Sequence, residues 1–234
     1  MKKGQTKSIQ ELIPADRSLV VGTIHEKSGL KLVRRGVTGL SGLDLLEMRL
    51  DCLYGVPLPE SWPLPVIATA RHPEEGGSGD LSFSTRHAML SEAIPWAAAI
   101  DVELRSSKAL APVIAEAHQY GRTVILSHHD FKATPSLRSL RSLAAKAAAS
   151  GADLFKVATQ VRDRNDLLTL IEFQSGNSPV PVVAMGMGNA GRFSRMVLAG
   201  FGAPLCYGWL GKPQVPGQWP ASELRSLLNG VLPA

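Results

Sequence analysis

Residues 125–135, "ILSHHDFKATP", end an apolar run with two histidines and an aspartate. Histidines at such a place serve as metal ligands, as proton-transfer groups or as ordinary polar loop residues. A zinc site on His128 and His129 is disfavoured because adjacent residues of a strand point to opposite sides. In addition, no cysteine or third histidine lies at ligand spacing. Proton transfer by one of the two histidines is the better interpretation.

A lysine, Lys156, stands inside the apolar run "DLFKVAT". Burial disfavours the charged amine and lowers its pKa from about 10.4 toward neutrality. A neutral amine can attack a ketone to form an imine, which then acts as an electron sink. The alternative is a lysine that extends from the strand end into solvent.

The run "EMRLD" places Glu47, Arg49 and Asp51 on one side of a strand, because strand side chains alternate. Charges that point into a protein interior are unfavourable unless they are paired or bound to a ligand. These residues therefore either bind substrate or form a structural ion pair in the floor of the fold. We favour the structural pair for Asp51.

Two glycine-containing segments carry further charges. In "RHPEEGG", Arg71 ends a strand, and the following loop could bring Glu74 or Glu75 to a histidine, unless it is simply an exposed surface loop. In "MGMGNAGRFSR" the glycines allow close approach of a ligand, and Arg195 could grip a carboxylate with two hydrogen bonds. The same segment could instead form a phosphate loop.

The elements that must position these groups alternate between strand and helix. Eight apolar or β-branched runs are expected to be strands, and helix-like segments such as 84–98 and 109–121 separate several of them. The pattern predicts a single (β/α)8 barrel, a TIM barrel, over residues 1–234, with residues 1–17 as an N-terminal extension or first hairpin. An open doubly wound sheet is the alternative, but no G-x-G-x-x-G follows the first strand. The eight runs are 18–25, 44–51, 65–71, 97–104, 123–129, 154–159, 180–186 and 204–211.

Prolines set two further expectations. Residues 52–65 contain four prolines, so the helix after the second strand should be shortened or missing. Thr134 and Pro135 resemble an N-cap followed by proline at the first helical position. The His–His–Asp segment would then occupy a short loop at the carboxyl ends of the strands, where barrels carry their chemistry.

The composition is that of a cytoplasmic enzyme. There is no apolar run of membrane-spanning length and no apolar segment behind the N-terminal lysines, so we expect neither a membrane association nor a signal peptide. Two cysteines, Cys52 and Cys206, make no disulfide framework or metal cluster. The net charge of +5 is spread along the chain without a recognition motif, so nucleic acid is not expected as a partner.

Taken in order, "EMRLD", "RHPEEGG", "SHHDF…TP", "FKVAT", "MGMGNAGRFSR" and "VPGQ" resemble the type I 3-dehydroquinate dehydratases over nearly the whole chain, from about Val20 to Gln218. The resemblance implies a (β/α)8 barrel, a homodimer, and no metal or cofactor. It also implies a carboxylate substrate, 3-dehydroquinate, which loses water in the shikimate pathway to give 3-dehydroshikimate.

The resemblance also implies roles for individual residues. Lys156 would form the imine, His129 would be the general acid and base, and Glu75 would orient it. The substrate would be held by Glu47, Arg49, Arg71, Arg195 and Gln218.

Two features depart from the family pattern. Gln214 stands where the family often has a small hydroxyl residue, and residues 52–65 replace a usual helix.

Two other functions remain alternatives. One is another Schiff-base barrel enzyme, such as a class I aldolase acting on a sugar phosphate, in which the glycine-rich turn would bind phosphate. The other is a non-catalytic binding protein of the same fold, which is disfavoured because every central ionisable group is present.

Overall fold

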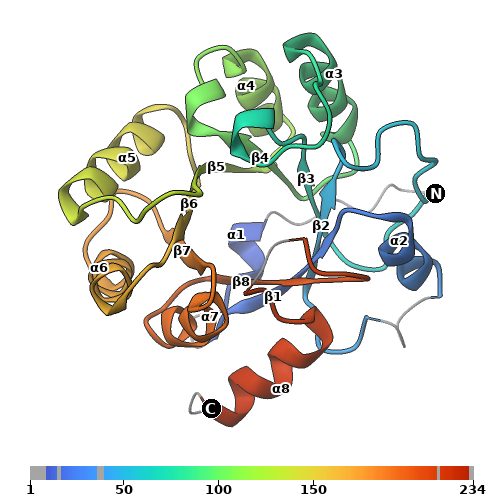
Figure 1. Ribbon diagram of the computed structural model, residues 1–234. Coiled ribbons are helices and arrows are strands. Elements are labelled where there is room, and N and C mark those ends of the chain that lie inside the picture. The colour runs from blue at the N-terminus through green and yellow to red at the C-terminus, as the bar shows by residue number, and fades with distance from the viewer. Residues whose placement is uncertain (1–8, 15–16, 36–39, 215–216, 232–234) are drawn as a thin grey trace.

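The computed structural model describes residues 9–14, 17–35, 40–214 and 217–231. Eight parallel strands form a nearly closed barrel with helices around it, as predicted (Figure 1). Each strand pairs with the next from β1 to β7, and β1 also pairs with β8; within the described residues the ladder does not join β7 to β8. The strands are β1 (Leu19–Ile24), β2 (Leu45–Arg49), β3 (Val66–Thr69), β4 (Ala99–Glu103), β5 (Thr123–Asp130), β6 (Leu154–Gln160), β7 (Val182–Met187) and β8 (Leu205–Trp209).

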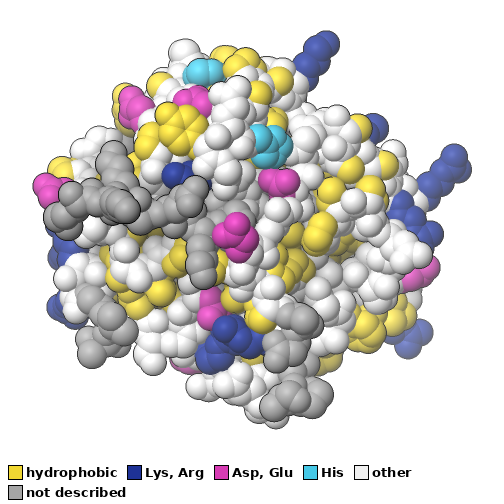
Figure 2. Space-filling model, turned by 180° about the vertical axis from the view of Figure 1, so that it is seen from behind, with side chains coloured by type: hydrophobic (Ala, Val, Ile, Leu, Met, Phe, Trp, Pro, Cys, Tyr) yellow, Lys and Arg dark blue, Asp and Glu magenta, His cyan; other side chains and the backbone are white. Residues whose placement is uncertain are grey.

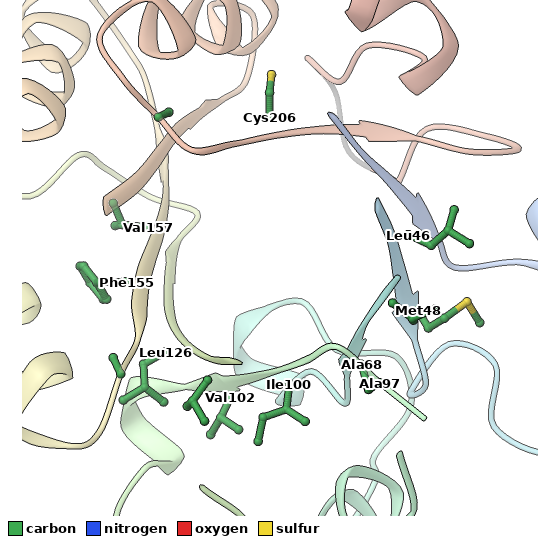
Figure 3. Packing of buried hydrophobic residues seen from close by; sticks show 14 of the residues in the cluster. Leu46, Met48, Ala68, Ala97, Ile100, Val102, Leu126, Phe155, Val157 and Cys206 are labelled. Carbon is green, nitrogen blue, oxygen red and sulfur yellow. The ribbon is translucent and has the colours of Figure 1, made fainter. Parts of the chain in front are cut away.

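Alternation along the strands divides the core into two parts. One set of side chains points outward and packs under the helices, as Leu46, Met48, Leu126 and Phe155 do in Figure 3. Phe155 is fully buried and meets Phe173 edge to face, with ring centroids 6.4 Å apart. Burying a large apolar side chain of this kind stabilises the fold by about 1.5–3 kcal/mol. This outer layer holds the strands in the register that sets the inner face.

The inner part of the core lies within the barrel. Apolar side chains such as Val21, Leu45 and Ile67 fill it. The short helix α1 (Ile9–Leu12) packs against this cluster through Ile9, whose backbone N–H donates to the Thr123 hydroxyl at 2.9 Å. Thr123 begins β5, so α1 covers the amino-terminal end of the barrel (Figure 1).

The helices that surround the strands follow the expected alternation. Residues 52–65 contain no helix, as their prolines predict, and Trp62 from this segment stacks on Trp96 with ring centroids 5.5 Å apart. An aromatic pair therefore covers part of the barrel wall where a helix would otherwise pack. The helices are α2 (Lys27–Arg34), α3 (Phe83–Ala93), α4 (Ala111–Gln119), α5 (Leu137–Ala149), α6 (Arg164–Ser175), α7 (Gly191–Gly200) and α8 (Ala221–Val231).

The start of α5 differs from the prediction. The helix begins at Leu137, and its N-cap is Ser136, whose hydroxyl accepts from the Ser139 N–H. Thr134 instead bonds to Thr159 on the neighbouring strand β6, with 2.9 Å between the hydroxyls. The prediction of a His–His–Asp loop was also wrong, because β5 continues through Asp130.

The amino-terminal region is only partly described. Residues 1–8 and 15–16 lie outside the described residues, so the expected extension or first hairpin stays a prediction, as does the single domain over residues 1–234. Among the described helices, none is long and apolar enough to cross a membrane. On the face shown in Figure 2, lysine and arginine side chains are dispersed around the surface rather than gathered in one patch.

Candidate active site

A cavity of about 240 Å³ opens at the carboxyl ends of the strands. Its walls contain every residue to which the sequence assigned a catalytic or binding role: Glu47, Arg49, Arg71, Glu75, His129, Lys156, Arg195 and Gln218. Residues without an assigned role also contribute: Thr23, Gly76, Phe131, Ala158, Met185, Met187, Tyr207 and Gln214. The fold thus brings the predicted residues together, while their individual roles stay predictions.

Lys156 lies at the centre of the cavity. Its side chain comes from β6, and the residue is 3% exposed, which rules out an extension into solvent. Nζ lies 2.5 Å from Asp101 Oδ2 and 3.4 Å from Glu47 Oε1, and 4.7 Å from the centre of the Tyr207 ring. The two carboxylates place negative charge beside the lysine nitrogen, an arrangement that the sequence-based expectation from burial alone did not include.

Glu47 is held on several sides. Its carboxylate accepts from the Thr23 hydroxyl at 2.8 Å and from the Thr69 hydroxyl at 3.1 Å, in addition to the Lys156 ammonium. Burial opposes ionisation, but Lys156 and the arginines Arg71 and Arg49 hold the pKa of Glu47 below its ordinary value. Glu47 is therefore an anion that can accept hydrogen bonds from ligand hydroxyls.

His129 and Glu75 form a hydrogen-bonded pair. His129 Nδ1 and the His129 backbone nitrogen both lie 3.0 Å from Glu75 Oε2. Burial, together with Arg71 and Lys156, lowers the pKa of His129 well below its ordinary value. A neutral imidazole that donates from Nδ1 keeps Nε2 free to accept a proton. The loop that carries Glu75 is the short helix η2 (Pro73–Glu75), and its Glu75 carboxylate is buried rather than exposed.

The Glu75 carboxyl gives a pH-dependent contribution to stability. Burial raises the pKa of Glu75 from 4.5 to about 7, so the folded protein keeps a proton that the unfolded chain releases between these values. The free energy of unfolding therefore falls as pH rises through this window. We expect Glu75→Gln to remove this slope, measured by urea unfolding at a series of pH values. His129 contributes with the opposite sign and is present in both proteins, so equal slopes in both would contradict the prediction.

His128 lies apart from this pair. It is half-buried and does not line the cavity, in keeping with strand alternation. Among the described residues, no group of three or more His, Cys, Asp or Glu side chains is arranged to hold a metal ion.

Arg49 is fixed by its neighbours. Nε and Nη2 donate to the two oxygens of Asp51 at 2.9 and 2.8 Å, and Nη2 also donates to the Gly76 carbonyl at 2.8 Å. Gly76 has a φ of +84°, a conformation that favours glycine. Asp51 is thus the expected structural partner, but it lies at the cavity end of the barrel and not in the floor.

Arg71 joins an inner network that the sequence analysis did not assign. Its Nη1 lies 2.8 Å from Asp101 Oδ1, 3.0 Å from Glu103 Oε1 and 2.6 Å from the Ser127 hydroxyl. Glu103 also pairs with Arg86 at 2.7 Å. The available signal was the period of two in "AAAIDVEL", which places both carboxylates of β4 on the inner face.

Arg195 enters the cavity from α7, beside the seam between β7 and β8. Nη1 donates to the Tyr207 carbonyl at 2.5 Å, whereas Nε is buried and has no hydrogen-bond partner among the described residues. Burial lowers the pKa of Arg195. A buried guanidinium with a free donor provides a place for an anionic group of a ligand.

The glycine-rich segment before α7 packs against backbone. A Cβ on Gly217 would lie 2.1 Å from the Gly188 carbonyl oxygen, and one on Gly191 would lie 3.1 Å from the Gly217 carbonyl oxygen. These glycines therefore allow the segment that follows β8 to approach closely. That segment carries Gln218, whose Oε1 accepts from the Gln214 backbone N–H at 2.8 Å.

Gln214 closes one side of the cavity. Its Oε1 accepts from Arg49 Nη1 at 2.8 Å, which joins the segment after β8 to β2. The residue that departs from the family pattern thus makes a direct contact with a predicted substrate-binding arginine.

A parallel barrel whose strand ends hold a buried lysine, a histidine–carboxylate pair and several arginines in one cavity is a (β/α)8 barrel enzyme. A family model described as type I 3-dehydroquinase matches residues 30–231. The chain belongs to this family.

Known proteins agree with this assignment. The chain is 31% identical over 235 residues to a 3-dehydroquinate dehydratase of Methanosarcina barkeri, with 91% of this chain and 94% of the relative covered. It is 31% identical over 202 residues to a catabolic 3-dehydroquinate dehydratase of Acinetobacter baylyi, with 82% and 74% covered. The crystal structure of the type I enzyme from Clostridium difficile superposes with a TM-score of 0.79 at 27% identity and covers 93% of both chains.

Proposed function

We propose that this protein dehydrates 3-dehydroquinate to 3-dehydroshikimate through an imine on Lys156. The observation that carries the proposal is that Lys156 and the His129–Glu75 pair line one buried cavity together with Arg195. Relatives that carry the name 3-dehydroquinate dehydratase support the choice of substrate.

The reaction needs an electron sink and one proton-transfer group. The Lys156 ammonium gives one proton to His129, and the resulting neutral amine adds to the substrate ketone. The departing hydroxyl takes this proton back and leaves as water, which gives a protonated imine. His129 then removes a proton from the adjacent carbon, and the electron pair moves toward the imine nitrogen to form an enamine. When that pair returns, the β-hydroxyl leaves with the proton that His129 holds, as water. Hydrolysis of the imine releases 3-dehydroshikimate and restores Lys156.

Other side chains would hold the substrate. Arg195 offers a buried donor to the carboxylate, and the carboxylate of Glu47 can accept from hydroxyl groups. Arg49, Arg71 and Gln218 line the same cavity and would contact the remaining oxygens. Since the cavity wall contains both carboxylates and guanidinium groups, it suits a polyhydroxylated carboxylate.

A class I aldolase acting on a sugar phosphate remains the alternative. That function would use the glycine-rich segment as a phosphate loop. The close contact of Gly188 and Gly191 with the Gly217 backbone disfavours this use, since the glycines already serve the packing of the segment after β8.

Borohydride trapping tests the proposal directly. The protein is treated with borohydride in the presence of 3-dehydroquinate, and its peptides are mapped by mass spectrometry. We expect a reduced adduct on Lys156. An active sample with no adduct, or an adduct on another residue, would contradict the imine mechanism on Lys156. Trapping by a sugar phosphate but not by 3-dehydroquinate would establish the aldolase function instead.

Arg195 should contribute to both binding and rate. Arg195→Lys keeps the charge but loses the two-pronged geometry, so we expect KM to rise and kcat/KM to fall by roughly 10- to 100-fold, the loss of one charged hydrogen bond. Arg192→Lys is the matched control, because Arg192 lies on the same helix but is exposed and stacks on Trp219. Steady-state kinetics of both variants measure KM and kcat/KM, and an equal effect in both would contradict the role of Arg195.

Gln214 should act on binding more than on the chemical step. Gln214→Ala removes the hydrogen bond to Arg49, and we expect KM to rise about fivefold with kcat changed less, from the loss of about 1 kcal/mol. Gln214→Ser introduces the small hydroxyl residue typical of the family and tests whether that contact substitutes. If Gln214→Ala lowers kcat with KM unchanged, the assignment to binding is wrong.

Several wider predictions accompany this function. They are a cytoplasmic location, a place in aromatic amino-acid biosynthesis through the shikimate pathway, a homodimer, and activity without a metal or cofactor.

A further inference from the structure

Asp101 lies against the lysine from below the cavity. It belongs to β4, has no exposed surface, and is not part of the cavity wall. Oδ2 lies 2.5 Å from Lys156 Nζ, yet the contact is an ion pair without the angles of a hydrogen bond. The attraction between the two groups is therefore mainly that of opposite charges.

The other oxygen of Asp101 is fixed separately. Oδ1 accepts from Arg71 Nη1 at 2.8 Å and from the Ser127 hydroxyl at 2.6 Å. Burial alone would favour the neutral acid, but Arg71 and Lys156 hold the pKa of Asp101 well below its usual range. Asp101 is consequently a permanent anion and a poor proton acceptor for Lys156.

Asp101 is fully buried and does not line the cavity, so a substrate in the cavity does not compete for its contact with Lys156. Imine formation turns Nζ into the imine nitrogen, so the positive charge of the protonated imine stays at the atom that Asp101 faces. Only the protonated imine withdraws electrons strongly enough to stabilise the carbanion. We propose that Asp101 is the counter-ion of the protonated imine and keeps it protonated during turnover. This inference rests on the proposed imine mechanism.

Glu47 is the competing counter-ion, and its surroundings differ. It lines the cavity, its nearest oxygen is 3.4 Å from Nζ, and two threonine hydroxyls share its carboxylate. Glu47 can thus also accept from substrate hydroxyls at the cavity wall, whereas Oδ2 of Asp101 faces only the lysine nitrogen. The charged or titratable groups that act on this nitrogen and on Asp101 are Glu47, Arg71, Glu75, His129 and Tyr207.

A pair of variants isolates the counter-ion. Asp101→Asn and Glu103→Gln each remove one buried carboxylate from Arg71, but only Asp101 faces Lys156. Wild-type protein is first trapped with borohydride and 3-dehydroquinate, and an absent adduct counts against the proposed function alone. The two variants are then compared with wild type by circular dichroism, by the pH dependence of kcat, and by the yield of trapped adduct as pH rises.

For Asp101→Asn we expect kcat to fall at least about tenfold, with its alkaline limb and the trapping yield displaced by about one pH unit toward lower pH. In Glu103→Gln the alkaline limb should stay in place, whatever the change in KM. An unmoved limb in Asp101→Asn, or an equal displacement in both variants, overturns the proposal.

If Asp101→Asn does not fold, the protonation of the imine nitrogen is measured instead in wild-type protein with ¹⁵N-labelled lysine. In the equilibrium mixture with 3-dehydroquinate, the imine nitrogen should stay protonated up to the pH at which the protein unfolds. Loss of that proton near neutral pH overturns the proposal.

Discussion

Replacing Lys156 with alanine should abolish turnover, with kcat lowered by roughly 10⁴-fold or more, as for other enzymes that lose a covalent nucleophile. No other lysine lines the cavity within the described residues, so no second amine is placed to form the imine. The measurement is the rate of formation of the conjugated product, with borohydride trapping as a second readout. The adduct should be lost along with the activity.

The same substitution should change stability. Lys156 is 3% exposed and faces two buried carboxylates, so its removal leaves the charges of Asp101 and Glu47 without their shared cation. Breaking a buried ion pair from one side typically costs about 3–5 kcal/mol, and Arg71 should reduce this loss by holding Asp101. Urea unfolding measures the difference.

An exposed lysine supplies the control. Lys212, whose side chain is 74% exposed, lies after β8 and should tolerate alanine with little change in kcat or stability. A Lys156→Ala protein that keeps more than a hundredth of the wild-type kcat would contradict the imine mechanism. An unchanged free energy of unfolding would show instead that the two carboxylates find other partners.

Local patterns were sufficient to predict most of the scaffold. The eight strands lie where the β-branched and apolar runs placed them, and the prolines of residues 52–65 correctly predicted a missing helix. These features depend on neighbours in the chain, since proline removes a backbone donor wherever it stands. Local signals failed at the start of α5, where Thr134 and Ser136 are both good caps. The contact of Thr134 with Thr159 on β6 decides between them.

The site was predictable in its residues but not in its connections. The family motifs identified Lys156, His129 and Glu75 as candidate catalytic residues, and all three line the cavity. The partners Asp101 and Tyr207 were missed because each looks like an ordinary strand residue until the register of distant strands is known. Asp101 meets Lys156 only because β4 and β6 flank β5 in the barrel. The partners of the lysine therefore depend on long-range geometry that burial of one residue does not reveal.

His129→Asn should lower kcat by about 10²- to 10⁴-fold, the usual contribution of one general acid and base. The imine itself needs Lys156 rather than the imidazole, so borohydride should still trap an adduct on Lys156 in this variant. Loss of activity with retention of the adduct separates proton transfer from imine formation. The neighbouring His128→Asn is the matched control, because His128 does not line the cavity and should keep wild-type kcat.

The pH profile gives an independent check on the same residue. Burial and the nearby cations lower the pKa of His129 well below 6.5, so the imidazole stays neutral, and able to accept a proton, at lower pH than an ordinary histidine. We expect the acid limb of kcat/KM to lie below pH 6.5 in wild-type protein and to disappear in His129→Asn. If the same limb persists in the variant, another group titrates there and His129 is not the base. If both histidine variants lose activity equally, the site depends on the integrity of β5 rather than on the imidazole that Glu75 orients.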